Sequence, residues 1–369
     1  MTATQSASEP ATHPQHADAP ADVVAERIFA LALAGAESMS VYVGDRLGYY
    51  RSLAADGPAT SAELARRTAT HERYVREWLE QQAVCGILLA HDEAGERRFE
   101  LPAGAAEVLT DESSLVFLGP MPRIFMAAAQ RLPELLDAYR HGDGVSWEEF
   151  GADARETQAA LNRPWFEHKL GDALRGVPDL DEALSRPGAR ILDVGCGAGW
   201  STLALARAYP AAVVEGVDID APSVEMARAN AAAAGLDGRV TFRVADAGSL
   251  AGSAAYDAAF AFECVHDMPR PVEVLQATRD AVREDGFVVV MDEAVADTFT
   301  SPGDDLERIM YAFSIFICLP DGMSSSPSRG TGTVMRRDVL RGYAQEAGFE
   351  DVDVLPIEDF SFFRFYRLR

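Results

Sequence analysis

Positively charged side chains are scarce in this 369-residue sequence. Its 33 Lys and Arg residues face 58 Asp and Glu residues, which gives a formal net charge of −25 at pH 7. Binding to nucleic acid or to an anionic membrane surface depends on Lys and Arg. The charge balance therefore disfavours both partners, whereas small neutral or cationic ligands are compatible with it.

Cysteine is also rare. The sequence has four, far apart and without a C-x-x-C pair, and they are Cys85, Cys196, Cys264 and Cys318. This spacing argues against a zinc ribbon and against the disulfide framework of small secreted proteins. We therefore expect a reducing, cytoplasmic setting and no metal among the site residues.

Long apolar runs are missing as well. No stretch reaches about 18 uninterrupted apolar residues, the minimum typical of a transmembrane helix, so no membrane-spanning segment is expected. Residues 1–20 have neither the basic start nor the apolar core of a signal peptide and predict a disordered tail. The rest of the chain, at 48% hydrophobic residues overall, suggests about two globular domains.

A glycine-rich turn lies between an apolar strand and a helix in the second half of the chain. Residues 190–194 are β-prone, and an alanine-rich helix is expected over residues 201–208, as in a βαβ unit. Gly195, Gly197 and Gly199 lie between them. Because glycine has no Cβ, the backbone can turn tightly there and a ligand can lie against it.

The spacing of these glycines distinguishes two kinds of cofactor. A dinucleotide fingerprint is G-x-G-x-x-G, but its third glycine would fall at Trp200, and the chain instead reads Asp-x-Gly-x-Gly-x-Gly from Asp193. A carboxylate at this position suits a cationic ligand better than a pyrophosphate, which prefers the bare N–H groups of a helix start. S-adenosylmethionine carries a sulfonium and an ammonium group, so it fits better than NAD.

Two further predicted strands end in acidic residues. The strand over residues 213–217 ends at Asp218, at roughly the 20-residue distance where an acid binds a ribose in such folds. The strand over residues 240–244 is followed by Asp246 and Ala247. Together with the glycine turn, these acids resemble the class I S-adenosylmethionine-dependent methyltransferases, from about residue 188 to the end of the chain.

This resemblance implies a role for each motif. In that family the glycine turn holds the methionine part of the donor, the acid after the second strand binds the ribose hydroxyls, and the acid after the third meets the adenine amino group. The donor-site residues that the resemblance implies are Gly195, Gly197, Gly199, Asp218 and Asp246. By their positions at the turn and at strand ends, Asp193, Ala247 and Glu263 are expected at the same site. A single strand-ending Asp often only caps a helix, but three motifs in register favour the donor site.

Residues 21–110 predict a winged-helix domain. Apolar residues at helical spacing over residues 21–55, broken by glycines, indicate two or three packed helices. Thr60-Ser61-Ala62-Glu63 matches a capping box that starts a short helix. A second helix is expected over residues 70–84, and a hairpin of two short strands over residues 87–101.

A winged helix raises the alternative of a DNA-binding, ligand-sensing regulator with a vestigial donor site. On the second helix, however, Arg73 and Arg76 are offset by Glu72, Glu77 and Glu80. Such a face repels phosphate, so the pattern favours a solvent-exposed surface over a DNA-binding one. The arrangement also resembles small-molecule O-methyltransferases, in which a winged-helix domain dimerises, and the apolar helices of this domain lead us to expect a homodimer.

Residues 111–187 predict a mostly helical connector whose prolines, including Pro164, bound its helices. Trp165 and Phe166 are predicted to lie in the interdomain core, with a wall of the ligand pocket as the weaker alternative.

A long insertion over residues 298–334 is rich in Met and aromatic side chains. In this position it can form a lid over an apolar or aromatic acceptor.

A histidine follows the fourth predicted strand. Residues 257–264 read as a buried parallel strand, and His266 and Asp267 come directly after it, where ligands lie in doubly wound sheets. Small-molecule O-methyltransferases place a general-base His followed by Asp here, whereas their usual next residue, Trp, is replaced by Met268. A hydroxyl is a poor nucleophile until it loses its proton, and His has its ordinary pKa near neutrality. The alternative is a His that only binds nearby backbone.

The fifth predicted strand, residues 287–291, is followed by two acids, Asp292 and Glu293. In the related family an acid at this point aligns the catalytic His, and we favour Glu293 while Asp292 stays open. The predicted catalytic residues are therefore His266, Asp267 and Glu293. The predicted reaction is methyl transfer to a small acceptor, most simply to oxygen, with N- or C-methylation without a general base as the alternative.

These patterns predict an α/β fold: a Rossmann-like, seven-stranded methyltransferase sheet with an N-terminal α-helical winged-helix domain. The predicted division is a tail over residues 1–20, the winged-helix domain over 21–110, the connector over 111–187 and the donor-binding domain over 188–369. The family resemblance, rather than the spacing, implies that the last strand is inserted antiparallel.

Overall fold

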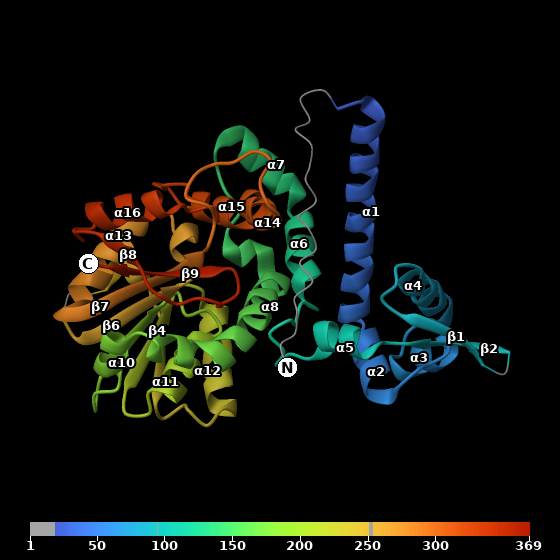
Figure 1. Cartoon of the computed structure of the whole chain (residues 1–369), viewed down its shortest axis with the longest axis horizontal. Helices are drawn as coiled ribbons and strands as arrows, with labels where there is room; N and C mark the ends of the chain where they lie inside the picture. The colour runs from blue at the N-terminus through green and yellow to red at the C-terminus, as the bar shows by residue number, and fades with distance from the viewer. Residues whose placement is uncertain (1–18, 94, 251–253) are drawn as a thin grey trace, which may run out of the picture.

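The computed structural model describes residues 19–93, 95–250 and 254–369. The predicted disordered tail lies outside the described residues except for its last two positions. Figure 1 shows a sheet-based body that contains the C-terminal half of the chain, a long helix α1 (Ala21–Arg46) that stands apart from this body, and a small domain on the other side of α1.

The body contains a seven-stranded sheet with the order β5-β4-β3-β6-β7-β9-β8. Its strands are β3 (Arg190–Val194), β4 (Val213–Asp218), β5 (Val240–Val244), β6 (Tyr256–Phe262), β7 (Val282–Glu293), β8 (Val352–Val354) and β9 (Phe363–Leu368). Strands β3 to β7 pair in parallel, and β9 lies antiparallel between β7 and β8. The predicted fold class and the antiparallel last strand are therefore confirmed.

Helices cover both faces of this sheet. The flanking helices are α9 (Gly171–Arg175), α10 (Pro178–Leu184), α11 (Trp200–Ala208), α12 (Ala221–Ala233), α13 (Pro271–Ala281) and α16 (Arg337–Glu346). Successive residues of a strand point to opposite faces. Ile191 of β3 thus packs in one buried cluster with Leu203 of α11, and Leu192 packs in the other with Val274 of α13.

The small domain has the helix and hairpin order of a winged helix. Its elements are α2 (Tyr49–Asp56), α3 (Ser61–Arg67), α4 (Glu72–Val84), β1 (Leu89–Glu93), β2 (Glu96–Glu100) and α5 (Ala103–Thr110). The predicted capping box is present: the Glu63 N–H donates to Thr60 Oγ1 at 3.2 Å, and the Thr60 N–H donates to Glu63 Oε2 at 2.9 Å. Tyr49, Tyr50 and Trp78 fill the core.

The two helices expected over residues 21–55 are present as α1 and α2, but of the three glycines only Gly48, with φ 71°, separates them. Helix α1 runs without a break through Gly35 and Gly44. A glycine costs a helix only about 1 kcal/mol, and Gly44 is needed because a Cβ there would lie 2.3 Å from the Trp78 ring. Packing against the small domain therefore outweighs the low helix propensity.

Most of α1 is exposed. It is the one helix of the described residues that is long and apolar enough to cross a membrane by length and composition, with a mean hydropathy of 1.2 over its best window. Core helices and N-terminal signal sequences meet the same criterion. Counting only uninterrupted apolar runs overlooked this helix, and the expected absence of a membrane span stays a prediction.

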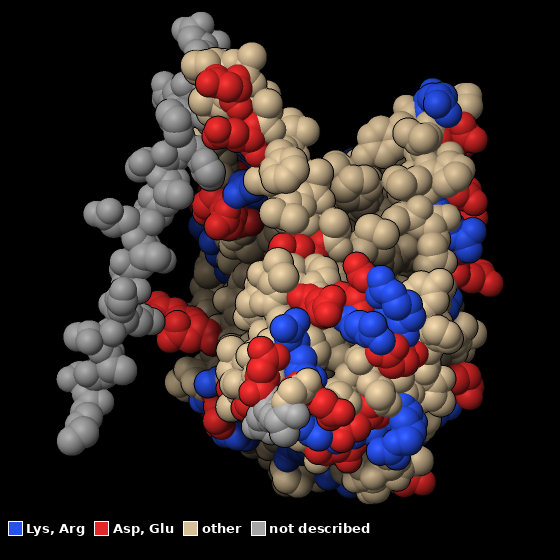
Figure 2. Space-filling view, turned by 90° about the vertical axis from the view of Figure 1, so that its right-hand side faces the viewer, with Lys and Arg blue, Asp and Glu red and all other residues tan. Residues whose placement is uncertain are grey.

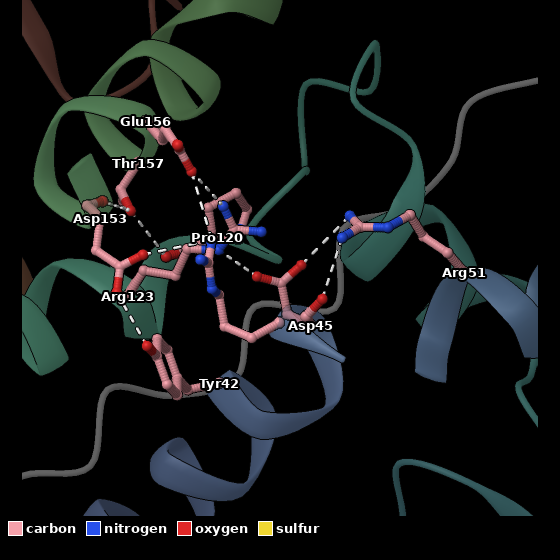
Figure 3. A network of polar contacts seen from close by, with 9 residues as sticks. Tyr42, Asp45, Arg51, Pro120, Arg123, Asp153, Glu156 and Thr157 are labelled. Carbon is pink, nitrogen blue, oxygen red and sulfur yellow. Dashed lines mark hydrogen bonds and ion pairs between the residues drawn. The ribbon is translucent and has the colours of Figure 1, made fainter. Parts of the chain in front are cut away.

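The connector ties α1 to the body. It contains α6 (Met121–Ala129), α7 (Leu132–His141) and α8 (Trp147–Trp165). Figure 3 shows how Arg123 of α6 binds Asp45 at the end of α1, while the Tyr42 hydroxyl donates to Asp153 of α8 at 2.9 Å. Asp45 is 4% exposed, so this polar link is largely shielded from water.

Pro120, Pro133 and Pro178 lie at helix starts, as expected, but Pro164 does not bound a helix. It lies inside α8, one residue from its end, and a π-helical turn over Phe166–Leu170 continues the chain. Phe166 packs edge-on against Phe262 of β6 and also contacts Phe360. Burial of this aromatic side chain stabilises the helical path across the proline, and the core reading of Phe166 is confirmed.

The long insertion lies next to the segment that follows β6. It contains α14 (Asp305–Phe313), a π-helical turn (Ser314–Cys318) and α15 (Leu319–Met323). The Gly332 N–H donates to the His266 carbonyl at 3.1 Å, and the Arg329 N–H donates to the Pro269 carbonyl at 2.9 Å. These bonds hold the insertion at the carboxyl edge of the sheet, where doubly wound proteins bind ligands.

Candidate active site

The glycine turn after β3 has the backbone that its sequence requires. Gly195, Gly197 and Gly199 have φ values of 68°, 50° and 81°, a region that residues with a Cβ rarely adopt. A Cβ at Gly195 would also lie 2.7 Å from the Cys264 sulfur. The turn is therefore open on its ligand side and tightly packed beneath.

Asp193 lies beneath this turn. Its carboxylate is fully buried, and its Oδ2 accepts hydrogen bonds from the hydroxyls of Ser201 at 2.7 Å and Thr202 at 2.5 Å. Its Oδ1 has no hydrogen-bond partner among the described residues. Burial, with the charge of Asp218, raises the pKa of Asp193 to about 6. The residue links the end of β3 to the start of α11.

Asp218 ends β4 and faces the same turn. Its Oδ2 accepts the Gly197 N–H at 2.8 Å, and its Oδ1 accepts the Asp220 N–H at 2.8 Å. Burial raises the pKa of Asp218 above its usual value. Asp246 lies farther along the edge, where it accepts the Gly248 N–H at 2.8 Å and caps the short 3-10 helix that begins at Ala247.

One ion pair at this edge was missed from the sequence. Asp220 caps α12, and Arg155 of α8 binds both of its oxygens, at 2.7 and 3.2 Å. Both side chains are about nine-tenths buried, at 11% and 9% exposure. The only sequence signal was the repeat of Asp at 218 and 220, and no local pattern identified the arginine 65 residues away. Helix α8 thus links the edge of the sheet proposed to bind the methyl donor, through Arg155, to helix α1, through the contact between Asp153 and Tyr42.

His266 lies at the carboxyl edge between β6 and β7 and is 2% exposed. Its Nδ1 is hydrogen-bonded to Asp292 Oδ1 at 2.9 Å, and Glu293 Oε2 lies 3.3 Å from the same nitrogen. Its Nε2 lies 3.0 Å from Asp267 Oδ1. The structure therefore brings together all three predicted catalytic residues and adds Asp292 as the acid that forms the hydrogen bond.

The charges of this cluster are strongly coupled. Burial alone would lower the pKa of His266, but the three surrounding acids outweigh burial and hold it well above 6.5. Burial and the charge of Asp292 raise the pKa of Glu293 well above 4.5. Burial opposes ionisation of Asp292 too, but the His266 charge keeps its pKa below 3.8. These directions favour a charged His266–Asp292 pair beside an uncharged Glu293.

Glu263 joins the donor edge to the His266 cluster. It has φ 53°, an uncommon conformation for a residue with a Cβ and one that often occurs at functional sites. Asn162 of α8 donates a hydrogen bond to its Oε2. Burial raises the pKa of Glu263 to about 7, so its charge changes near neutrality.

The insertion contributes two polar residues that the sequence patterns did not identify. Asp321 of α15 accepts the Trp147 N–H at 2.7 Å, and burial followed by the charge of Asp267 raises its pKa to about 7. Cys318 lies beside His266 and Asp267. Neither residue belongs to a sequence motif. Both lie more than 45 residues after His266 in the sequence, and the fold of the insertion brings them to the site.

The site fits a cationic donor and a proton-bearing acceptor. The open glycine turn lies among buried acids, which suit a sulfonium and an ammonium group. A buried imidazole, oriented by a carboxylate, lies along the same edge. Such an imidazole can take a proton from a hydroxyl once it is neutral. Among the described residues, His266 is the one histidine in this cluster.

Two family models match the chain. Residues 191–286 match the model described as "Methyltransferase domain", and residues 35–111 match the "Rv2258c-like winged HTH domain". Together they define the class: the chain contains a methyltransferase domain over residues 191–286, preceded by a winged-helix domain over residues 35–111.

Proteins of similar sequence include small-molecule methyltransferases. The chain is 29% identical to 27-O-demethylrifamycin SV methyltransferase of Amycolatopsis mediterranei, over 52% of this chain and 64% of that protein. It is 32% identical to the O-methyltransferase cnsE of Penicillium expansum, over 47% of this chain and 56% of that protein. The chain thus spans under two thirds of the length of these relatives.

Solved structures share the fold across nearly the whole chain. The mitomycin 7-O-methyltransferase MmcR has a TM-score of 0.69 at 20% identity, covering 95% of this chain and 98% of that one. Human N-acetylserotonin methyltransferase, solved with S-adenosylmethionine, has a TM-score of 0.68 at 17% identity, covering 94% and 97%. RosA of Streptomyces davawensis, an amino-group dimethyltransferase by its name, has a TM-score of 0.62 at 19% identity, covering 94% and 98%.

Proposed function

We propose that the protein transfers a methyl group from S-adenosylmethionine to a hydroxyl of a small apolar or aromatic molecule, with His266 as the general base. The observation that carries this proposal is the buried His266, held by Asp292 at the same sheet edge as the glycine turn. The names of the relatives support a small-molecule acceptor.

S-adenosylmethionine supplies the methyl group on a positively charged sulfur. Gly195, Gly197 and Gly199 give its methionine part room against the backbone, and Asp218 is placed to accept hydrogen bonds from the ribose. His266 Nε2 would take the acceptor proton as the oxygen bonds to the methyl group, while the methyl–sulfur bond breaks and S-adenosylhomocysteine leaves. Asp292 holds the Nδ1–H so that Nε2, on the Asp267 side of the ring, is the nitrogen that accepts the proton, and Asp292 stabilises the imidazolium that forms.

The test replaces His266 with Gln or Ala. Phenolic and other hydroxyl acceptors are assayed with labelled donor methyl, and donor affinity is measured by calorimetry. We expect unchanged donor affinity and a loss of roughly 10²–10⁴ in methyl transfer. A folded variant with wild-type turnover and an unchanged pH profile would remove O-methylation from first place.

N-methylation is the second candidate because RosA carries the name of an amino-group dimethyltransferase and shares this fold. A neutral amine already has a lone pair and needs only alignment with the donor. The same panel therefore includes amine acceptors. Transfer to amines that survives His266→Gln would favour this candidate.

The surface of the winged-helix domain is unfavourable for DNA binding. Figure 2 shows basic and acidic side chains interspersed on the face that includes the winged-helix domain. On α4, Arg73 pairs with Glu77 at 2.6 Å and Arg76 pairs with Glu72 at 2.8 Å. Cations already neutralised by neighbouring acids contribute little to phosphate binding. We therefore assign the domain to assembly and substrate closure rather than to DNA.

We also propose that α1 pairs with a second copy of the chain. Its apolar side chains are exposed, among them Ile28 at 59% and Phe29 at 71%, and such a surface marks an interface. Light scattering should give a dimer mass that Phe29→Asp reduces to a monomer, whereas Val84→Asp, on α4, should not. A monomeric wild-type protein would refute this pairing.

The free cysteines of the described residues are compatible with the proposed reducing, cytoplasmic setting.

A further inference from the structure

A thiol lies beside the proposed catalytic histidine. Cys318 ends the π-helical turn of the insertion, and its Sγ lies within 4.8 Å of an imidazole nitrogen of His266 and of a carboxylate oxygen of Asp267. The imidazole nitrogen on the Asp267 side is Nε2, at 3.0 Å from Oδ1. One nitrogen, one oxygen and one sulfur within this distance form a donor set that suits Zn²⁺.

The histidine is already oriented as a metal ligand would be. Its Nδ1 is hydrogen-bonded to Asp292, which is 0% exposed. A carboxylate on the far nitrogen fixes the ring and leaves Nε2 for the metal, an arrangement common to zinc-binding histidines. Asp292 thus lies outside the ligand set but supports it.

Buried polar groups surround the thiol. Asp267 Oδ1 lies 3.0 Å from His266 Nε2 and has no further hydrogen-bond partner among the described residues. Thr333 is 1% exposed, and its Oγ1 has no hydrogen-bond partner among them. A buried hydroxyl without a partner is costly, so a ligand at this point would stabilise the cluster. The side chain of Asp267 is 32% exposed, which leaves a path for an ion to enter.

We propose that His266, Asp267 and Cys318 form a Zn²⁺ site that closes the acceptor side of the active site. Zinc displaces the protons of the Cys318 thiol and of His266 Nε2, which pass to solvent. It then occupies the Nε2 lone pair that would otherwise take the acceptor proton, so the zinc-bound enzyme is inactive. Zinc therefore competes with the acceptor and leaves donor binding intact. This inhibition rests on the proposed methyl transfer, whereas the binding of zinc does not.

The first experiment measures binding alone. ZnCl₂ is titrated by calorimetry into the full chain loaded with S-adenosylhomocysteine, with Cys318→Ser as the variant and Cys85→Ser, in the winged-helix domain, as the matched control. We expect one ion per chain and at least about a tenfold weaker affinity for Cys318→Ser, because even loss of an outer partner of a zinc site costs this much. Cys85→Ser should match wild type.

Cobalt provides an independent signature. Co²⁺ bound through Cys318 gives a sulfur-to-cobalt charge-transfer band, which Cys318→Ser abolishes and Cys85→Ser keeps. Circular dichroism confirms that each variant is folded. Unchanged zinc affinity in both Cys318→Ser and Asp267→Asn overturns the site, as does cobalt binding without the charge-transfer band.

The second experiment adds zinc to the acceptor panel. Loss of methyl transfer that excess acceptor restores, and that Cys318→Ser resists, supports the inhibitory role. Zinc that binds without slowing transfer, or that speeds it, overturns that role. Absence of transfer to every acceptor in chelator-treated enzyme refutes the proposed function instead, and the binding result then stands by itself.

Discussion

Asp292→Asn separates the roles of the two adjacent acids after β7. In the structure Asp292 accepts the hydrogen bond from His266 Nδ1 at 2.9 Å, and the two side chains are 1% and 2% exposed. The amide keeps the size of the side chain but removes its charge, and its NH₂ group can favour the tautomer that carries the proton on Nε2. The base then loses both its orientation and the stabilisation of its charged form.

The magnitude follows from the burial of this pair. A hydrogen bond to a charged group contributes about 1.5–3 kcal/mol, which corresponds to a fall of roughly 10- to 150-fold in rate. Removal of His266 as a base sets the limit, at roughly 10²–10⁴. The pKa of His266 should fall as well, because Asp292 is one of the acids that raise it.

Glu293→Gln is the matched control. Burial and the charge of Asp292 raise the pKa of Glu293 well above 4.5, which favours its uncharged form. Glutamine has the size of that uncharged form, and we expect turnover close to wild type. Single-turnover transfer of labelled methyl measures the chemical step, calorimetry checks donor affinity, and circular dichroism checks the fold.

The reasoning is refuted by either of two results. If Glu293→Gln loses as much activity as Asp292→Asn, then Glu293 is the supporting acid, as the sequence analysis favoured. If Asp292→Asn turns over like wild type with unchanged donor affinity, neither tautomer control nor charge stabilisation by this residue contributes to the reaction.

Four further predictions concern the donor edge, the chain link, the base and the small domain. Asp218→Ala should weaken S-adenosylmethionine by about 1.5–3 kcal/mol for each lost ribose hydrogen bond; calorimetry giving wild-type affinity contradicts this. Arg155→Ala leaves Asp220 buried without its counter-ion and should lower the free energy of unfolding by roughly 3–5 kcal/mol in chemical denaturation, unlike Arg140→Ala at an exposed pair. Only neutral His266 accepts a proton, and its pKa lies well above 6.5, so the rate should rise with pH through that pKa. By NMR, the pKa of His266 should be lower with S-adenosylmethionine than with S-adenosylhomocysteine, whose sulfur is uncharged, and equal values would place the sulfonium away from the base. The winged-helix domain should give no gel shift with duplex DNA at physiological salt, and a sequence-specific shift at sub-micromolar protein would restore the regulator reading.

The donor edge could be predicted from the sequence because it is built from neighbouring residues. An apolar strand, three glycines with positive φ and a helix form one continuous segment, so their order determines the turn. The capping box at Thr60 is equally local and is present as predicted. The order of strands and helices then restricts the fold to a doubly wound sheet.

Helix boundaries were less predictable where distant parts of the chain pack together. Gly44 reads as a helix break, yet Trp78 and Tyr50 need the space beside it. Pro164 reads as a helix end, yet burial of Phe166 against Phe262 continues the chain past it. Local propensity is worth about 1 kcal/mol for a glycine, and burial of a large side chain exceeds that.

The sequence by itself determined which residue types surround the site: an acid under the glycine turn, an acid after β4, a histidine after β6 and two acids after β7. Only the tertiary structure decided which of them touch. His266 and Asp292 meet because β6 and β7 are paired in one register, and the choice of Asp292 over Glu293 depends on the direction of each side chain at the strand end. Arg155 comes from helix α8 and Cys318 from the insertion, both far in sequence from the residues that they contact. Chain packing alone creates these contacts, so a local sequence pattern cannot predict them.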